Sequence, residues 1–331
     1  MSTPLLLLIA LIKSVIIMAI LLTGFAYATL LERKLVAGMQ VRYGPNRVGP
    51  WGMLQPLADG IKLVFKEDAT PRGADRFVFA LAPLISVVMA MSAFAVVPIG
   101  DSVTIFGQVI PLELANVNVG LLYILGATAL GVYGIVLAGW ASNNKYSLLG
   151  SVRSSAQMIS YELSLGLSLV GVIMITGTLQ LPDIVKAQTP VWFIFLQPLG
   201  FIIYFVSAIA ETNRAPFDLP EAETELVAGY HTEYSGMRFA MFYMAEYINM
   251  LTVSSIATTI FLGGWHGPFN FVSGPWWFFF KVFILMCVYV WLRATLPRLR
   301  YDRLMNFGWR ILLPAALLNV VLTAGGILIF T

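Results

Sequence analysis

Five carboxylic acids crowd into one short stretch of the sequence, ETNRAPFDLPEAETEL, at positions 211–226. Carboxylates held close together repel one another, and protonation, a nearby cation such as Arg214 or movement must relieve that repulsion. A solvated acidic loop is the simpler interpretation, but Pro216 and Pro220 argue against a floppy segment. The stretch is therefore a candidate for proton chemistry, carried by Glu211, Asp218, Glu221, Glu223 and Glu225.

Two more glutamates lie well inside long apolar stretches, Glu162 in QMISYELSLGL and Glu246 in FYMAEYINML. A charged carboxylate near the centre of a bilayer costs at least about 2.5 to 3.5 kcal/mol, so such side chains face the bundle interior or water. Burial favours the neutral carboxyl, which would let these groups exchange protons near neutral pH. The alternative is a neutral glutamate that only hydrogen bonds to a neighbouring helix. Two acids in different stretches, together with Glu211, favour a proton relay.

The elements that must position these acids are membrane-spanning helices. Only 11% of the 331 residues are charged and 59% are hydrophobic, whereas a soluble domain carries about 25% charged residues. Apolar stretches of about 20 residues recur along the chain, each long enough to cross a hydrocarbon core of roughly 30 Å. We predict an all-α integral membrane protein, a single membrane domain over residues 1–331, with about eight spans at roughly 5–29, 77–99, 118–140, 156–178, 192–210, 239–263, 276–295 and 310–330.

The distribution of Lys and Arg predicts the orientation of these spans. Basic residues near the ends of spans are retained in the cytoplasm, and nearly all of them follow the first, third, fifth and seventh spans. The opposite side has only Lys186, with Lys13 and Lys281 inside or at the edge of spans. We therefore expect both termini outside the cell and the acidic loop, about 211–238, in the cytoplasm.

The first cytoplasmic segment combines a basic loop with an amphipathic helix at about 52–66. Apolar residues recur there at helical spacing opposite a polar face, which is typical of a helix lying in the membrane surface. Such a helix either anchors a loop or forms one wall of a lateral opening for a lipid-soluble molecule. The turns at Gly44-Pro45 and Gly49-Pro50 fix the preceding loop, so that its arginines could surround a polar ligand or a partner instead of serving only as topological signals.

Other chemistries find little support in the sequence. The single cysteine, Cys287, can form no disulfide within the chain and cannot supply the four thiolates of an iron-sulfur cluster. The two histidines, His231 and His266, fall on opposite sides of the membrane by this topology, which argues against a haem or a metal. No glycine-rich loop follows a strand pattern, and the net charge of +3 reflects topology and not nucleic-acid binding.

Three long strings carry a resemblance to a known family: ERKLVAGMQVRYGPNRVGPWGMLQPLADGIKL, AETNRAPFDLPEAETELVAGYHTEYSGMRFAMFYMAEY and RATLPRLRYDRLMNFGW. They resemble the signature segments of the H subunits of bacterial NADH:quinone oxidoreductase, respiratory complex I, over essentially the full chain. The resemblance implies a multi-pass subunit of the bacterial inner membrane with periplasmic termini and no redox centre or covalent cofactor of its own. Spans two to six would resemble half of an antiporter-like pumping subunit.

The resemblance also implies roles for particular residues. Quinone would be the substrate, while FMN and iron-sulfur clusters would belong to partner subunits of the peripheral arm, and small membrane subunits would lie alongside. Glu162, Glu211 and Glu246 match the family's intramembrane carboxylates, and Arg214, Asp218, Glu221, Glu223 and Glu225 its loop beside the quinone cavity. Residues expected at the quinone tunnel or its interface are Glu32, Arg33, Arg42, Arg47, Trp51, Asp59, Phe242 and Met244.

Two other functions remain open at this point. The corresponding membrane subunit of an energy-converting hydrogenase would use no quinone, and the extended RYGPNRVGPWGMLQP loop favours the quinone enzyme instead. A free-standing secondary transporter would also carry intramembrane acids, but it should show inverted repeats or interrupted helices at matching points of its halves. The sequence shows neither of these features.

Overall fold

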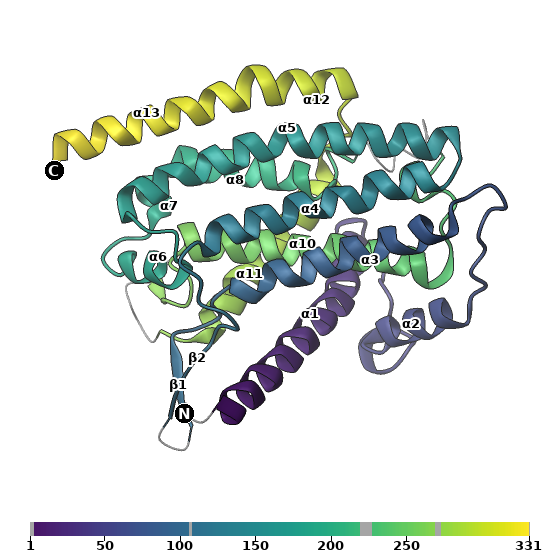
Figure 1. The fold of residues 1–331 in the computed structure, drawn as a ribbon, viewed down its shortest axis with the longest axis horizontal. Helices are drawn as coiled ribbons and strands as arrows, with labels where there is room; N and C mark the ends of the chain where they lie inside the picture. The colour runs from purple at the N-terminus through teal and green to yellow at the C-terminus, as the bar shows by residue number, and fades with distance from the viewer. Residues whose placement is uncertain (1–2, 106–107, 219–226, 269–272, 331) are drawn as a thin grey trace.

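The computed structural model describes residues 3–105, 108–218, 227–268 and 273–330. Within these residues the chain is almost entirely helical, with one small two-stranded sheet (Figure 1). The predicted all-α membrane fold is confirmed. The N-terminus, the sheet and the C-terminus lie toward one end of the helical bundle, and α2 lies toward the other (Figure 1).

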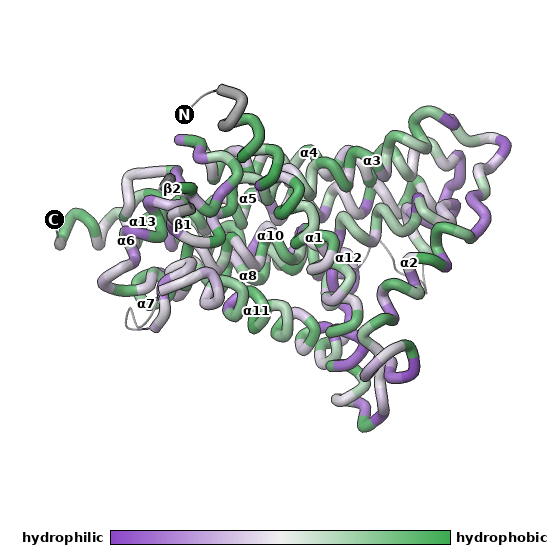
Figure 2. Tube along the Cα trace, turned by 90° about the horizontal axis from the view of Figure 1, so that it is seen from below, coloured by the Kyte–Doolittle hydropathy of each residue, from purple (hydrophilic) through white to green (hydrophobic). Residues whose placement is uncertain are grey.

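Six helical segments of the described chain are long and apolar enough to cross a membrane. They are α1 (Thr3–Met39), α3 (Arg76–Ala93), α4 (Gly120–Ala141), α5 (Lys145–Thr176), α11 (Pro275–Thr295) and the continuous run of α12 (Tyr301–Phe307), η5 (Gly308–Leu312) and α13 (Leu313–Phe330). Most strongly hydrophilic residues lie in the loops and not along these helices (Figure 2). The other two predicted spans, the fifth and the sixth, are less regular.

The predicted span at 192–210 corresponds to two helices, α7 (Phe193–Leu196) and α8 (Pro198–Glu211), which are separated by a break at Gln197. Pro198 can open a helix but lacks the N–H that would continue one. The sixth predicted span corresponds to α10 (Gly236–Phe261), which has 26 residues. Glu246, Asn249 and several hydroxyl residues reduce the hydropathy of α10, which is why it is not among the six apolar segments.

Several helices extend beyond their apolar stretches. The helix α1 continues to Met39, past the predicted boundary at residue 29, and α5 begins at Lys145 and not near residue 156. The side chain of Asn144 caps α5 by accepting a hydrogen bond from Tyr146 N at 2.9 Å. The differences have a simple cause, because hydropathy marks the part of a helix that can lie in lipid, whereas capping and hydrogen bonds decide where the helix ends.

The two ends of the bundle differ in structure. At the hairpin end, which we define as residues 97–105, 108–119, 177–197, 262–268 and 273–274, β1 (Ser102–Ile105) pairs antiparallel with β2 (Gln108–Pro111), and α6 (Leu181–Ala187) follows α5. The sequence analysis did not predict this hairpin. The basic end comprises residues 40–75, 142–144, 212–218, 227–235 and 296–300, and it holds most Lys and Arg of the described loops.

The predicted amphipathic helix at about 52–66 is present as α2 (Gln55–Phe65), preceded by η1 (Pro50–Gly52). None of its residues is buried, and Leu57, Val64 and Phe65 expose 63%, 62% and 84% of their surface. Figure 1 shows α2 standing beside the bundle and not within it. Its apolar side is therefore available to lipid or to a lipid-soluble molecule.

Close helix packing around α4 holds the bundle together. A Cβ atom added at Gly134 would lie 2.1 Å from Ser86 Oγ, and one at Gly139 would lie 2.1 Å from Ser151 Oγ. Only glycine leaves room for α3 and α5 at these points, as is typical of small residues at helix interfaces in membranes. The likeness of spans two to six to an antiporter-like subunit stays a prediction.

Candidate functional site

The centre of the site is the buried guanidinium of Arg214, which follows α8 and is only 5% exposed. Its Nε lies 2.8 Å from Glu246 Oε1 on α10, and its Nη1 lies 3.7 Å from Glu32 Oε2 on α1. One arginine therefore connects two carboxylates that come from helices far apart in the sequence. Its Nη2 is buried without a hydrogen-bond partner among the described residues.

Glu32 has further partners that complete this group of charges. The hydroxyl of Tyr247 donates to Glu32 Oε2 at 2.5 Å, and Arg293 on α11 forms an ion pair with the other oxygen. The guanidinium of Arg214 also lies 4.3 Å from the centre of the Tyr247 ring. We call Glu32, Arg214, Glu246, Tyr247 and Arg293 the arginine cluster. Two acids balance two arginines, which is the condition for burying charges.

The turn that carries Arg214 is fixed by Gln157, a fully buried residue of α5. Its Nε2 donates at 2.8 Å to the carbonyl of Ala210 and also at 2.8 Å to the carbonyl of Phe217. Asn213 ends the helix with a left-handed φ of 52°. Beyond the turn, Asp218 pairs with Arg298 Nη2 at 2.9 Å. The stretch 211–218 is therefore held in place by these contacts.

A small cavity of about 30 Å³ lies between α3, α4, α8 and α10. Glu211, which is 9% exposed, and Glu246 both line this cavity. Asn249 also lines it, and the Oδ1 atom of Asn249 is buried without a partner among the described residues. The volume and the polar lining suit a bridging water molecule. The second and third predicted relay acids thus share one polar space.

Glu162, the remaining predicted relay acid, is half-buried on α5 and lies near enough to Glu211 for their charges to interact. The side chain of Thr128 on α4 also hydrogen bonds to Glu211. Tyr161, next to Glu162, donates instead to the carbonyl of Leu304 at 2.9 Å and takes a structural place. The three predicted acids therefore form a series, Glu246 to Glu211 to Glu162.

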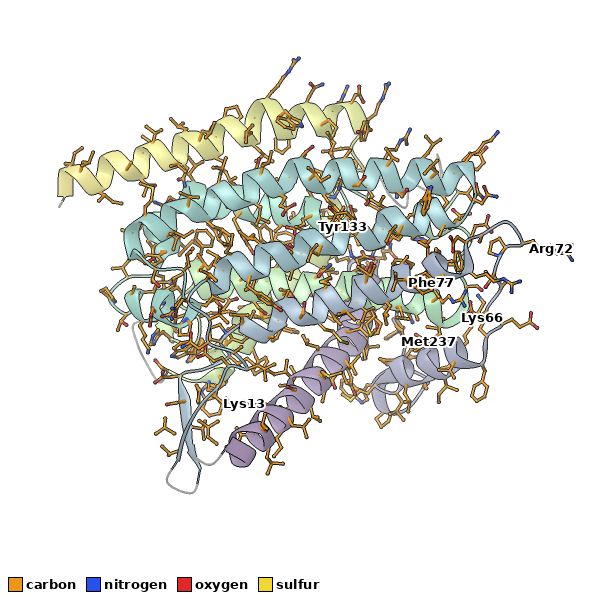
Figure 3. All side chains as sticks on the ribbon, viewed as in Figure 1. Lys13, Lys66, Arg72, Phe77, Tyr133 and Met237 are labelled. Carbon is orange, nitrogen blue, oxygen red and sulfur yellow. The ribbon has the colours of Figure 1, made fainter. Side chains whose placement is uncertain are left out.

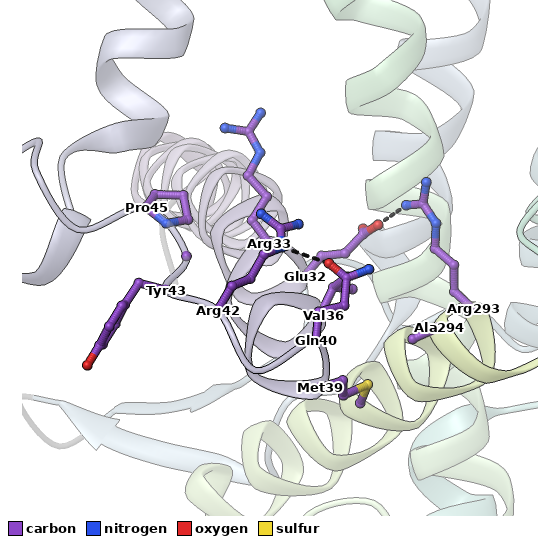
Figure 4. A pocket seen from close by; sticks show the side chains of 11 residues that line it. Glu32, Arg33, Val36, Met39, Gln40, Arg42, Tyr43, Pro45, Arg293 and Ala294 are labelled. Carbon is purple, nitrogen blue, oxygen red and sulfur yellow. Dashed lines mark hydrogen bonds and ion pairs between the residues drawn. The ribbon is translucent and has the colours of Figure 1, made fainter.

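Two larger pockets lie on the other side of the arginine cluster. The polar pocket, of about 680 Å³, lies where α1 ends and includes Glu32, Arg33, Arg42 and Arg293 among its lining residues (Figure 4). The apolar pocket, of about 470 Å³, lies between α1, α2 and α10. Its walls include Phe25, Phe239 and Tyr243.

Arg33 lines both pockets and joins α1 to α2 through an ion pair with Asp59 at 2.7 Å. Glu32, its neighbour in the sequence, lines the polar pocket and belongs to the arginine cluster. In Figure 4, Glu32 and Arg293 point toward one another at the edge of the polar pocket. A continuous series of groups therefore runs from the apolar pocket to the buried acids.

The other predicted tunnel residues occupy more varied places. Phe242 is buried and lines the small cavity, and Met244 packs against the main hydrophobic core. Arg47 and Trp51 line neither large pocket, and Trp51 is 79% exposed with a left-handed φ of 56°. Glu221, Glu223 and Glu225 lie outside the described residues.

Sequence reasoning missed three contributors to the site. Arg293 and Arg298 counted only as topological signals, although the first pairs with Glu32 and the second with Asp218. Asn249 was passed over, although it lies three residues after Glu246 and therefore on the same face of α10. A polar residue one turn from an intramembrane acid is the signal that could have identified it.

The histidines and acids of the described residues offer no metal site, since no three such side chains or cysteines gather closely enough to hold an ion. His231 lies beside Tyr230 and Phe239, with ring centroids 4.8 and 5.3 Å away. Burial lowers the pKa of His231 to about 4. Its imidazole is therefore neutral at physiological pH and packs as an aromatic ring.

Comparison with known proteins identifies the family of the chain. Residues 12–324 match the family described as NADH dehydrogenase. The chain belongs to this family. It is 56% identical to the H subunit of the NADH-quinone oxidoreductase of Thermomicrobium roseum, over 93% of each chain. It is also 54% identical to an H subunit of the same enzyme from Geobacter metallireducens over 95% of each chain, and 56% identical to that of Protochlamydia amoebophila over 91% of this chain and 92% of the relative.

Membership of the NADH dehydrogenase family confirms the resemblance drawn from the three sequence strings. Together with the six apolar helical segments, it identifies a multi-pass membrane protein. The relatives bear the name of a subunit of an oxidoreductase complex, so that other subunits are implied for proteins of this kind.

Proposed function

We propose that this chain is the membrane subunit of a proton-translocating NADH:quinone oxidoreductase that forms much of the quinone tunnel and begins the path of acids leading to the proton pumps. It would carry no redox centre and would not be catalytic alone. The observation that carries this proposal is the position of Arg214, which pairs with Glu246 and lies 3.7 Å from Glu32, a residue of the polar pocket.

The apolar pocket suits the entry of a lipid-soluble molecule. It lies behind α2, whose exposed apolar residues would sit in the membrane surface, and its aromatic walls suit an isoprenoid tail and a ring. This favours the interpretation of α2 as a wall over that of a simple anchor. The names of the relatives support quinone as the molecule, and a hydrogenase subunit or a free transporter has no comparable support.

The polar pocket suits the quinone head group. Its arginines can hydrogen bond to carbonyl oxygens and stabilise negative charge as the quinone is reduced. Reduction consumes two protons per quinone, and the electrons would come from the iron-sulfur clusters of partner subunits bound over the basic end. The residues that face the head group from this chain would be Arg33, Arg42 and Glu32.

The arginine cluster would convert the reduction of quinone into a change of charge inside the membrane. A proton taken up by Glu32 would weaken its attraction for Arg214, which would then pair more completely with Glu246. That shift alters the electrostatic field at the small cavity, where Glu246 and Glu211 can exchange a proton through water. Glu162 would pass the proton onward toward neighbouring membrane subunits.

The orientation follows from the proposed assembly. The basic end would face the cytoplasm, where the peripheral subunits with FMN and iron-sulfur clusters bind, and both termini would lie on the periplasmic side of the inner membrane. Glu221, Glu223 and Glu225 would continue the acidic loop from Asp218 toward the quinone cavity. Arg47 and Trp51, which line neither large pocket, would contact a partner subunit and not quinone.

The test replaces Glu246 or Glu162 with Gln, which keeps the size and hydrogen bonding of the neutral acid but cannot ionise. Both variants should assemble normally yet lose NADH-driven quinone reduction and proton pumping in membrane vesicles. Electron transfer from NADH to ferricyanide is the control, since it should stay intact. Glu→Asp at the same sites should retain more activity than Glu→Gln. Full pumping by both Gln variants would remove these acids from the mechanism.

A further inference from the structure

Four of the few charged side chains in the half of the molecule that holds the hairpin end act on one buried carboxyl group, that of Glu113. Apart from the amino terminus, the charged residues in this half of the molecule are Lys13, Asp101, Glu113, Asp183, Lys186 and Lys281. They come from α1, the segment before β1, the segment after β2, α6 and α11. Neither the quinone tunnel nor the relay of acids uses any of them.

Glu113 is the buried member of this group, with 6% of its surface exposed. Its Oε2 atom has no hydrogen-bond partner among the described residues. Its main-chain carbonyl accepts a hydrogen bond from Lys13 Nζ at 3.0 Å, and Figure 3 labels Lys13 on the half of α1 nearer the hairpin. A buried carboxylate oxygen without a donor is costly to leave charged.

Charged groups of both signs surround Glu113. Lys13 and Lys186 favour its ionised form, whereas Asp183 and Asp101 oppose it. Burial is the largest influence and raises the pKa of Glu113 above its ordinary value despite the two lysines. Glu113 lies in the connecting segment that follows β2, outside the membrane-spanning helices.

We propose that Glu113 is a proton-binding site at the hairpin end, which takes up one proton from the adjoining aqueous phase and is linked to α1 through Lys13. The reaction is the addition of a proton to the carboxylate, without a redox step or another reactant. Protonation removes the negative charge next to Lys13, on the same helix that carries Glu32 at its other end. The inference is independent of the proposed quinone chemistry.

The experiment is an infrared pH titration of the complex purified with all its subunits. A protonated carboxyl group has a C=O band that disappears on ionisation, and Glu113→Gln identifies the band of this residue by difference. We expect the band to persist at pH values above the ordinary glutamate pKa of about 4.3. If the Gln variant shows the same carboxyl bands as the unchanged protein at every pH, the proposal is overturned.

Variants that keep Glu113 make the test independent of any folding defect in Glu113→Gln. Removing a cation destabilises the carboxylate, so Lys13→Met should shift the midpoint of the band to higher pH, and Lys186→Met should shift it less. Asp101→Asn should shift it to lower pH. Lys34→Met, at the opposite end of α1, is the matched control and should leave it unchanged. A midpoint near 4.3 that none of these changes moves would contradict the site.

Discussion

The buried acids at the two ends of the molecule differ in whether they have partners of opposite charge. In the arginine cluster, Glu32 and Glu246 each have an arginine within 4 Å, and Tyr247 adds a hydrogen bond. At the hairpin end, Glu113 keeps one carboxylate oxygen buried without a partner among the described residues. Paired charges can stay ionised inside the protein, whereas an unpartnered acid gains most by binding a proton. The comparison suggests that one region transmits changes of charge and the other takes up a proton.

The largest expected effect concerns the side of the membrane that each end of the molecule faces. Cysteines introduced at Asn118 and Ser273, both exposed at the hairpin end, should react with an impermeant thiol reagent from outside intact cells. A cysteine at Asn306, exposed on α12, should react only once the cytoplasmic side is opened. Cys287→Ser provides the background without a native thiol. The reverse pattern would place the basic end outside and exclude its role in binding the electron-transfer subunits.

Removing the guanidinium of Arg214 should cause the largest loss of stability. Arg214→Met leaves Glu246 buried without its close cation, and breaking a buried ion pair in this way costs about 3–5 kcal/mol. The variant should unfold or dissociate from its complex at a markedly lower temperature. Adding Glu246→Gln to Arg214→Met should recover part of the loss, because the pair is then neutral.

Arg303→Met, a change at an exposed arginine of α12, is the matched control for Arg214→Met. It should cost less than about 1 kcal/mol, as surface charges usually do. Equal losses of stability for the two variants would mean that the buried, paired guanidinium of Arg214 stabilises the protein no more than an exposed one. A double variant as unstable as the single one would mean that Glu246 is not the acid that Arg214 compensates.

A moderate effect is expected at the polar pocket. Arg42 lines the pocket and donates through its Nε to Gln40 at 2.7 Å, so that its guanidinium lies where a ligand of the pocket would bind. Arg42→Ala should raise the KM for quinone several-fold while NADH-to-ferricyanide transfer stays intact, whereas Arg47→Ala should act mainly through assembly. A raised quinone KM in Arg47→Ala with normal assembly would contradict this division.

Much of this arrangement was accessible from the sequence, because hydropathy identifies spans and an acid inside a span usually has a functional role. Glu211 lies near both Glu246 and Glu162 in the structure, and the role of the three acids as a relay stays a prediction. The break at Gln197 and the β1–β2 hairpin were missed, since both depend on local backbone hydrogen bonding and not on hydropathy. Arg293 was missed because a basic residue near a span end has the same sequence pattern whether it faces water or a buried acid.

The smallest effect concerns His231, the basic-end counterpart of Glu113, because burial shifts the pKa of each group in the direction that favours its neutral form. The pKa of His231 is lowered to about 4, against about 6.5 in an unfolded chain. Below about pH 6.5 the imidazole of His231 binds a proton in the unfolded chain but not in the folded chain. Stability therefore falls as pH decreases toward 4. The slope from one group is at most about 1.4 kcal/mol per pH unit, and less here because part of the ring is exposed.

His231→Gln cannot bind that proton and should flatten the decline of melting temperature between pH 6.5 and pH 4. Glu113→Gln should act with the opposite sign, because a raised pKa makes the folded protein lose stability as pH increases through that pKa. Measuring the melting temperature of this chain in the purified complex across that range therefore separates the two groups. An unchanged acid slope in His231→Gln would mean that the imidazole is protonated in the folded protein, contrary to its aromatic packing.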